Sequence, residues 1–225
     1  MKKVIQFFVL ICFSMNGVFA QNQELKNTKN NSITIAPLSI FNILDPAIQI
    51  GYQRELPNDL IFQIEGGIIL RHSIFGFMGL NLYNGSVNYS YSGYKLQTEL
   101  KKVLYEKGNK VNRKSYIAGE FFYSKNRGNV NNTYKNSTGE SYADFFIQEK
   151  HKYRLGAKLG MQLVFGRNFL IDYSVGMGLA YNHVEHFDRE NINDKSYSPL
   201  YGFILRQGDF IRLNLPTNFK IGYKF

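Results

Sequence analysis

The last 13 residues of the chain, LNLPTNFKIGYKF (residues 213–225), decide the fold class. Apolar or aromatic residues occupy almost every second position, and polar residues or glycine lie between them. Successive side chains of a β-strand point to opposite faces, so this period places Phe219, Ile221, Tyr223 and Phe225 on one face. Repeated along the chain, the pattern predicts a closed barrel that is apolar outside and polar inside, the form in which β structure crosses a membrane.

Seven further alternating segments precede this one. The expected strands cover residues 32–39, 46–56, 60–71, 91–104, 114–125, 145–165, 168–182 and 210–225. Short connections (57–59, 105–113, 166–168) alternate with long ones (72–90, 126–144, 183–209), as periplasmic turns alternate with outer loops, although the first outer connection, 41–45, is short. The sequence therefore predicts an all-β fold, an eight-stranded antiparallel up-and-down transmembrane barrel over residues 32–225. Ten strands are the alternative, because residues 126–165 have room for an extra hairpin.

The start of the chain is typical of an exported protein. Lys2 and Lys3 precede an apolar run over residues 4–13, and a small-residue cleavage site ends at Ala20. We expect a cleaved signal peptide over residues 1–20, a short polar segment over 21–31 and a location in the bacterial outer membrane. Cys12, the only cysteine, would be removed with the signal peptide, which excludes a disulfide scaffold for the mature chain.

The mature chain is basic. Removing the signal peptide takes away two lysines and no acid, so the formal net charge falls from +10 to +8. In an exported protein with basic residues spread over alternating strands, this charge favours a polar interior and an anionic lipid neighbour over nucleic acid. No run of 18 apolar residues follows the signal peptide, which excludes a helical inner-membrane protein.

Alternation alone does not reveal which face looks inward, and a soluble β-sandwich or lipocalin-like barrel would have the opposite sense. The aromatic content of the apolar faces, the terminal Phe225 and the absence of disulfides favour the membrane form.

If the apolar faces contact lipid, the opposite faces carry charged side chains into the interior. The predicted interior charge network consists of Glu65, Lys95, Glu99, Lys101, Glu120, Arg154, Lys158, Asp172, Arg212 and Lys220. An eight-stranded barrel is just wide enough for side chains to fill, so these charges are expected to pair and form a plug; a narrow ion path is the alternative.

Other candidate sites give weaker signals. His183, Glu185 and His186 combine metal-ligating residue types, but their spacing matches no strong zinc motif, and we favour a polar loop stem with no metal. Ser73 with His72, or Ser196 and Ser198 with His183, could serve a lipid-A-modifying enzyme. None of these residues lies in a recognisable motif. Neither an enzyme nor a cofactor is therefore expected.

The long outer connections are the best candidate binding surface, because loops on a rigid scaffold commonly bind ligands. Residues 126–142 (NRGNVNNTYKNSTGESY) combine Arg127, Lys135 and Tyr134 with many amides, a composition that suits sugar or phosphate contacts. The simpler interpretation is that these residues only cover the barrel with a hydrophilic loop and bind no ligand. The sequence identifies no external ligand.

Four segments carry a resemblance to a known class. APLSIFNILDP (36–46) leading into IGYQRE (50–55), YIAGE (116–120) and the closing GYKF (222–225) resemble small, uncharacterised outer-membrane β-barrel proteins of Gram-negative bacteria. In architecture they are similar to the eight-stranded barrels of the outer-membrane protein A and X type. The resemblance implies that Tyr223 and Phe225 form the signal read by the barrel-assembly machinery. It also implies outer-membrane lipid and lipopolysaccharide as neighbours.

Overall fold

The structure, a computed structural model, describes residues 30–41, 46–70, 87–108, 111–135, 141–166, 168–189 and 206–225. The expected signal peptide and nearly all of the polar segment after it lie outside these residues. Among the described residues, no helix is long and apolar enough to span a membrane.

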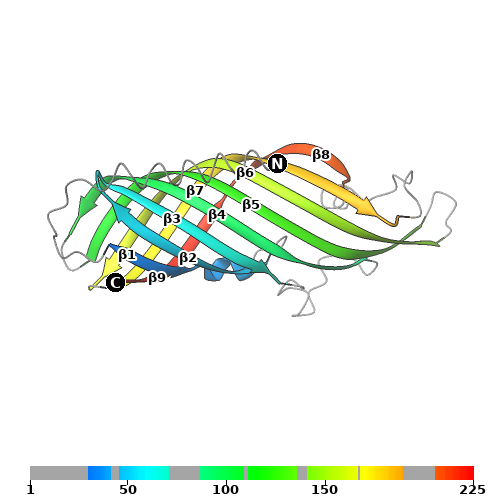
Figure 1. Ribbon diagram of the computed structural model, residues 1–225, viewed down its shortest axis with the longest axis horizontal. Coiled ribbons are helices and arrows are strands. Elements are labelled where there is room, and N and C mark those ends of the chain that lie inside the picture. Colours follow the sequence, from blue (N-terminus) through cyan, green and yellow to red (C-terminus); the bar gives the residue numbers. More distant parts are fainter. Residues whose placement is uncertain are drawn as a thin grey trace, which may run out of the picture.

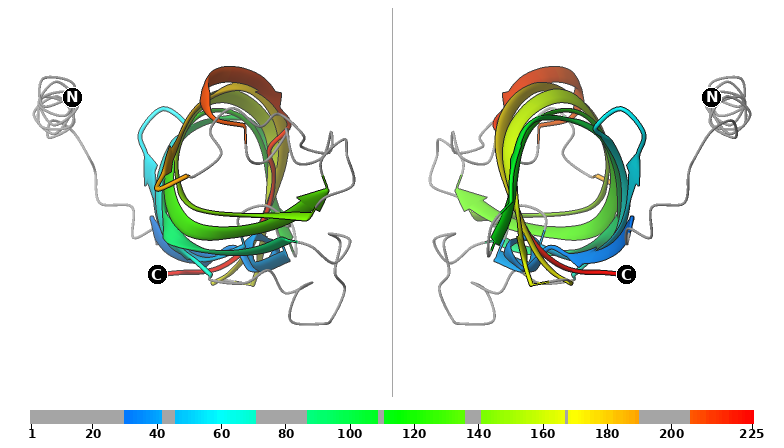
Figure 2. Two further views of the ribbon diagram at one scale, coloured as in Figure 1. Left: turned by 90° about the vertical axis from the view of Figure 1, so that its right-hand side faces the viewer. Right: turned by 90° about the vertical axis from the view of Figure 1, so that its left-hand side faces the viewer.

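The segments with alternating apolar and polar residues form a single closed sheet (Figures 1 and 2). Its elements are β1 (Asn31–Ile35), the 3-10 helix η1 (Pro37–Phe41), β2 (Ala47–Leu56), β3 (Leu60–Ile69), β4 (Val87–Lys107), β5 (Val111–Lys135), β6 (Ser141–Phe165), β7 (Phe169–Phe187), β8 (Gly208–Asn214) and β9 (Thr217–Lys224). Every strand pair is antiparallel, and β1 pairs with β9 to close the ring. Because β8 and β9 pair with successive parts of β7, they form one interrupted strand. The predicted closed, eight-stranded antiparallel barrel is confirmed.

The strand register determines how steeply the strands are inclined. Starting at Ile33 and crossing one paired residue at a time through β2 to β7, the path reaches Leu213 on β8. The direct partner of Ile33 is Tyr223, so the sheet closes with a stagger of 10 residues, the difference between 213 and 223. For eight strands this stagger corresponds to a tilt of about 40° from the barrel axis.

The barrel is apolar outside and polar inside. On β6, Leu155 and Leu159 are 67% and 61% exposed, whereas Lys158 between them is 1% exposed. The same alternation runs along β7, where buried residues alternate with exposed or half-exposed ones over most of its length. A soluble barrel has the reverse arrangement, so the sense favoured from the aromatic content is the one present.

Two prolines explain where the first predicted strand ends early and where the last one is interrupted. The first strand ends at Ile35 rather than residue 39, and Pro37, which has no N–H to donate, begins η1. The last predicted strand is interrupted at Pro216 for the same reason. There the Gly176 N–H donates to the Pro216 carbonyl at 2.9 Å, which keeps the interrupted strand attached to β7.

The prediction of a long loop over residues 126–144 is wrong, and so is the ten-strand alternative. β5 and β6 pair without interruption from Val111 with Phe165 to Lys135 with Ser141. The polar composition concealed these strands because they project beyond the rest of the barrel (Figure 1). Their inward residues Val130 and Phe146 are nevertheless buried.

The short turns gather at one end of the barrel, together with the C-terminus. Asn58 and Asp59 have φ of 60° and 56° in the turn between β2 and β3, and Gly166 has φ of 60° in the turn after β6. The turn between β4 and β5 is shorter than predicted, because β4 runs to Lys107. At this end the Phe225 N–H donates to the Asn31 carbonyl at 2.8 Å. We call this the turn end, and the opposite end the loop end.

Candidate functional site: the polar interior and the loop-end rim

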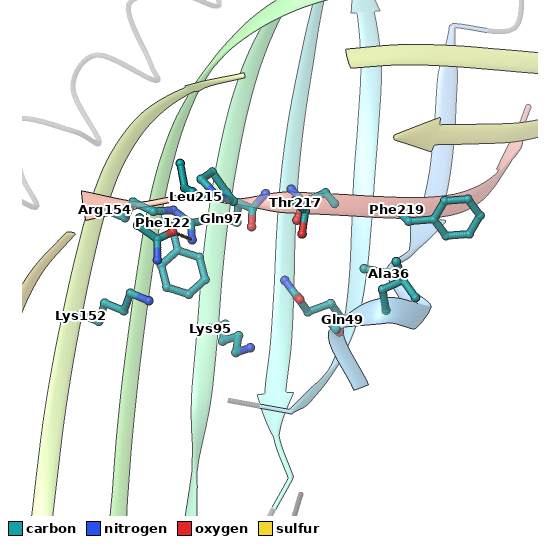
Figure 3. Close-up of a pocket in the computed structure, with 15 residues that line it drawn as sticks. Ala36, Gln49, Lys95, Gln97, Phe122, Lys152, Arg154, Leu215, Thr217 and Phe219 are labelled. Carbon is teal, nitrogen blue, oxygen red and sulfur yellow. Dashed lines mark hydrogen bonds between the residues drawn. The ribbon is translucent and has the colours of Figure 1, made fainter. Parts of the chain in front are cut away.

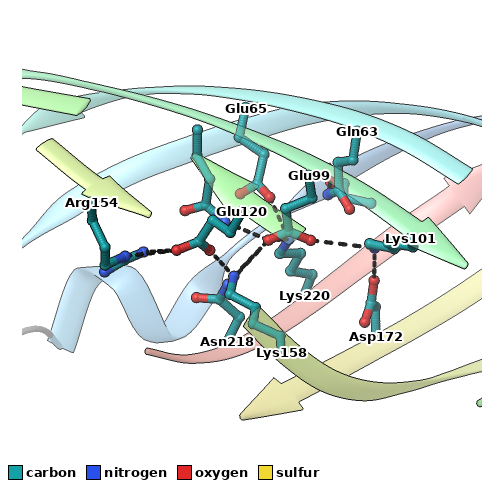
Figure 4. A network of polar contacts seen from close by, with 12 residues as sticks. Gln63, Glu65, Glu99, Lys101, Glu120, Arg154, Lys158, Asp172, Asn218 and Lys220 are labelled. Atoms are coloured by element: carbon teal, nitrogen blue, oxygen red, sulfur yellow. Dashed lines mark hydrogen bonds and ion pairs between the residues drawn. The ribbon is translucent and has the colours of Figure 1, made fainter. Parts of the chain in front are cut away.

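The interior contains two zones along the barrel axis. A cavity of about 510 Å³ lies beside η1 and the interruption between β8 and β9 (Figure 3). Next to it, charged side chains from opposite walls meet in a dense network (Figure 4). Both zones are built from the inward-facing positions of the alternating strands, so the same period that makes the outside apolar supplies them.

The network joins four carboxylates to four cations. Glu99 on β4 is its centre: its carboxylate lies 2.7 Å from Lys158 Nζ, 3.0 Å from Lys220 Nζ and 3.7 Å from Lys101 Nζ. The remaining pairs are Glu120 with Arg154 and Lys158, Glu65 with Lys220, and Asp172 with Lys101. Eight of the ten predicted interior charges therefore lie together.

Neutral side chains complete the network around Asp172. The Tyr116 hydroxyl donates to Asp172 Oδ1 at 2.5 Å, and Gln162 Nε2 donates to Asp172 Oδ2 at 3.0 Å. Sequence reasoning missed both residues because neither is charged. Their parity was a usable signal, since Tyr116 has the same inward parity as Glu120 on β5, and Gln162 the same as Lys158 on β6.

Equal numbers of opposite charges make the network self-neutralising. An ion removed from water costs several kcal/mol unless charges and hydrogen bonds compensate for it, and here each carboxylate contacts at least one cation. The side chains of Glu99, Lys101 and Lys158 are at most 1% exposed. The network therefore holds its charges away from solvent and compensates each carboxylate with a nearby cation.

The other two predicted charges lie elsewhere. Lys95 is buried and lines the cavity. Arg212 on β8 is half-buried, with its guanidinium carbon 4.3 Å from the centre of the Phe210 ring. A second cluster, which was not predicted, lies near the turn end: Glu55 accepts from Lys224 at 2.7 Å and lies 3.1 Å from Lys114.

A row of tyrosines crosses the outer face of four neighbouring strands. The ring centres of Tyr94 and Tyr123 are 6.0 Å apart, those of Tyr123 and Tyr153 4.9 Å, and those of Tyr153 and Tyr181 6.2 Å. We call these four residues the tyrosine girdle. The outward positions from the girdle toward the turn end are mostly apolar.

The first outward positions on the loop-end side of the girdle are charged or ionisable on β5, β6, β7 and β8. Lys125, His151, His183 and Asp209 are aligned directly across β5, β6, β7 and β8. His151 accepts from or donates to the Tyr123 hydroxyl at 3.0 Å, which joins this row to the girdle. On these strands the outer surface changes from tyrosine to charged or ionisable side chains within one or two outward positions.

His183 is held between two carboxylates in this row. Its Nδ1 lies 2.6 Å from Asp209 Oδ1, and its Nε2 lies 3.1 Å from Glu185 Oε1. These hydrogen bonds, the one to Asp209 above all, raise the pKa of His183 above its ordinary value. The same contact lowers the pKa of Asp209.

The weak metal candidate does not assemble. His183 and Glu185 share the outer face, as their spacing predicts, but His186 points inward, where its ring centre lies 4.4 Å from that of Phe146. Across the residues that the structure describes, no group of three His, Cys, Asp or Glu side chains could hold a metal ion. The Ser/His candidates His72, Ser73, Ser196 and Ser198 lie outside the described residues.

Tyr223 and Phe225, the residues of the expected assembly signal, lie on the outer face at the turn end and are 58% and 46% exposed.

No protein-family model matches the sequence, and neither does any curated protein. Among solved structures, the chain is similar to a major outer membrane protein from Thermus thermophilus, with a TM-score of 0.46 and 11% sequence identity. That similarity covers 87% of this chain and 98% of the other.

Proposed function

We propose that the chain is a bacterial outer-membrane β-barrel with a plugged interior, and that its role is structural or interactive at the cell surface rather than enzymatic. The observation that carries this proposal is that apolar side chains are exposed on the outside of the sheet while polar side chains are buried inside it. Hydrocarbon favours paired backbone polar groups and apolar outward side chains, and an antiparallel barrel with a mostly apolar outer face and a polar interior fits both conditions over most of its wall.

The height of the apolar surface supports this proposal. On β6 the outward positions from Tyr153 in the girdle to Phe165 at the turn end are Leu155, Ala157, Leu159, Met161 and Leu163. This segment of roughly 12 residues, at about 3.3 Å per residue and a tilt of about 40°, rises about 30 Å. That distance matches the hydrocarbon thickness of a bilayer.

The interior network supports a plug over a pore. A water-filled path through eight strands would require the side chains to leave the axis open. Instead, Lys220 from β9 and Glu99 from β4 meet in the interior with their charged atoms 3.0 Å apart.

The loop-end extension supports a surface role. β5 and β6 continue beyond the girdle as a paired ribbon whose outer side presents Arg127, Phe145 and Glu149. Its inner side is stabilised by buried Val130 and Phe146 and by Val184 of β7. A folded ribbon presents side chains in fixed positions, which is a better basis for recognition than a flexible cap.

Two measurements test the proposal. Membrane-extracted protein should migrate differently on SDS gels before and after heating, because small folded barrels resist SDS; a soluble periplasmic species without this shift would overturn the membrane assignment. In planar bilayers the purified protein should show no steady conductance. An open state of hundreds of picosiemens would refute the plug while leaving the barrel intact.

A further inference from the structure

At one seam, strand pairing closes the barrel over only part of its height. β1 pairs with β9 from Ser32 with Lys224 to Ile35 with Ile221, near the turn end. Beyond Ile35 the chain turns into η1, which contacts β2 and β9. Among the described residues, β8 pairs with β7 alone, so its other edge has no strand beside it.

The cavity lies directly behind this seam. Ala36 and Leu38 line it from the η1 side, and Leu215, Pro216 and Thr217 line it from the interruption between β8 and β9 (Figure 3). Leu38 and Leu215 line the cavity and are nevertheless 55% and 66% exposed. These two side chains form an apolar mouth of the cavity at the seam.

The deeper wall of the cavity is cationic. Lys95, Lys152 and Arg154 line it together with amides and a threonine, and no described residue that lines it is acidic. Arg154 also contacts Glu120 and donates to Asn214 Oδ1 at 2.9 Å, which fixes its guanidinium at the edge of the charge network. A guest in the cavity would therefore meet three cationic side chains, of which Arg154 is already paired with Glu120.

The unpaired part of the seam begins about midway along the apolar surface, and the cations lie nearer the girdle. Thr217 pairs with Val175, roughly midway along β7 between Phe169 and Tyr181. Lys95 and Lys152 are the chain neighbours of Tyr94 and Tyr153 in the girdle. In a bilayer, this geometry brings the cations to the headgroup level of the outer leaflet and the apolar mouth to acyl-chain level.

We propose that this cavity binds the phosphate headgroup of an anionic membrane lipid, which enters sideways through the seam while its acyl chains stay outside along Leu38 and Leu215. This inference rests on the proposed membrane location. A volume of about 510 Å³ fits a phosphate headgroup with its attached glycerol or sugar. Lysine ammonium groups suit phosphate, and the polar wall of Gln49, Gln97 and Asn214 suits its hydroxyl-rich attachment.

Native mass spectrometry of the folded barrel in a neutral detergent tests the proposal, with short-chain phosphatidylglycerol and phosphatidylcholine of identical chains as probes and inorganic phosphate as a third. We expect phosphatidylglycerol to bind at least roughly tenfold more tightly than phosphatidylcholine. Lys152→Gln, a change at a half-buried position, should abolish that difference, and Lys95→Gln should do the same. Lys102→Gln, which removes an exposed lysine on β4 at the turn end, should leave it unchanged.

Each outcome bears on the proposal. Equal binding of the two lipids would overturn it, and so would a Lys102→Gln variant that loses the preference for phosphatidylglycerol as fully as Lys152→Gln does. Inorganic phosphate that binds as tightly as phosphatidylglycerol would show that the site takes free phosphate instead. Leu38→Trp, which narrows the mouth, should weaken lipid binding; unchanged binding would refute lateral entry. Heat-modifiable migration, measured on each variant, separates loss of binding from loss of the fold and from failure of the membrane assignment.

Discussion

Lys220 and Glu99, 121 residues apart in the chain, meet in the barrel interior with Nζ and Oε1 3.0 Å apart. One belongs to the closing strand and the other to β4. Their contact spans the interior, so it forms only when the sheet has closed with its stagger of 10 residues. The polar interior therefore does more than fill space, because its charges match only in one register.

The first prediction concerns Glu99→Gln. This substitution removes the carboxylate that faces Lys101, Lys158 and Lys220 and leaves their charges less compensated in a buried site. We expect the free energy of unfolding to fall by about 3–5 kcal/mol. Urea unfolding of the barrel refolded into lipid vesicles measures it. Glu106→Gln, at a carboxylate that is 45% exposed, should change it by less than about 1 kcal/mol, and equal losses in the two variants would contradict the central role of Glu99.

A second prediction tests the outer boundary at the girdle. Leu159→Arg places a charge on the outer face of β6 about halfway between Tyr153 and Phe165, and should cost about 2–4 kcal/mol in vesicles. Phe145→Arg makes the same kind of change on the loop-end side of the girdle and should cost about 0–1 kcal/mol. Similar costs at the two positions would place the membrane boundary elsewhere.

A third prediction concerns the fit between Gly160 and Tyr116. A methyl group at Gly160 would overlap the Tyr116 ring, which is buried, and would push its hydroxyl away from Asp172. Gly160→Ala should therefore destabilise the barrel by about 1–3 kcal/mol in the same unfolding assay. Gly119→Ala, at a glycine with open space around it, is the control and should change stability by less than about 0.5 kcal/mol. A neutral Gly160→Ala would mean that Tyr116 has room to move.

The fourth prediction is a pH window for the pairing of β7 with β8. The pKa of His183 is raised, so its contact with Asp209 is fully present below the ordinary value of 6.5 and is lost as the pH rises through the raised value. The pKa of Asp209 is lowered, so its contribution is present above 3.8 and is lost as the pH falls through the lowered value. The protection factors of the Val184 and Gly208 amides, which correct the exchange rate for its intrinsic pH dependence, should be largest between these limits.

The corresponding variants separate the two carboxylates. Asp209→Asn should move the pKa of His183, followed by NMR, back toward 6.5 and more strongly than Glu185→Gln, since the hydrogen bond to Asp209 is the larger cause. Asp188→Asn, at an exposed carboxylate that does not contact His183, is the control. A His183 titration indifferent to Asp209→Asn would contradict this assignment.

The strands that could be predicted are those whose outer face needs apolar side chains. Alternation from Tyr153 to Phe165 identified β6 within the apolar surface, and the parity of Glu99 and Lys158 assigned them inward. The same signal fails beyond the girdle, where residues 126–135 pair as strand although the outward side chains of Arg127 and Asn129 are polar. Sequence parity also does not show which charges meet. The contact between Lys158 and Glu99 depends on the stagger, which emerges only when all eight strands close.

The last prediction separates assembly from stability at the C-terminus. Phe225 is 46% exposed on the outer face, and its backbone N–H, rather than its ring, bonds to Asn31. Phe225→Ala should therefore leave refolding into detergent micelles nearly unchanged. In cells it should strongly reduce the heat-modifiable form in the outer membrane, if the ring is read by the assembly machinery. Phe165→Ala removes a comparably exposed ring at the same end of the barrel and should reduce neither. Equal cellular yields of the two variants would show that the terminal ring serves only as part of the apolar surface.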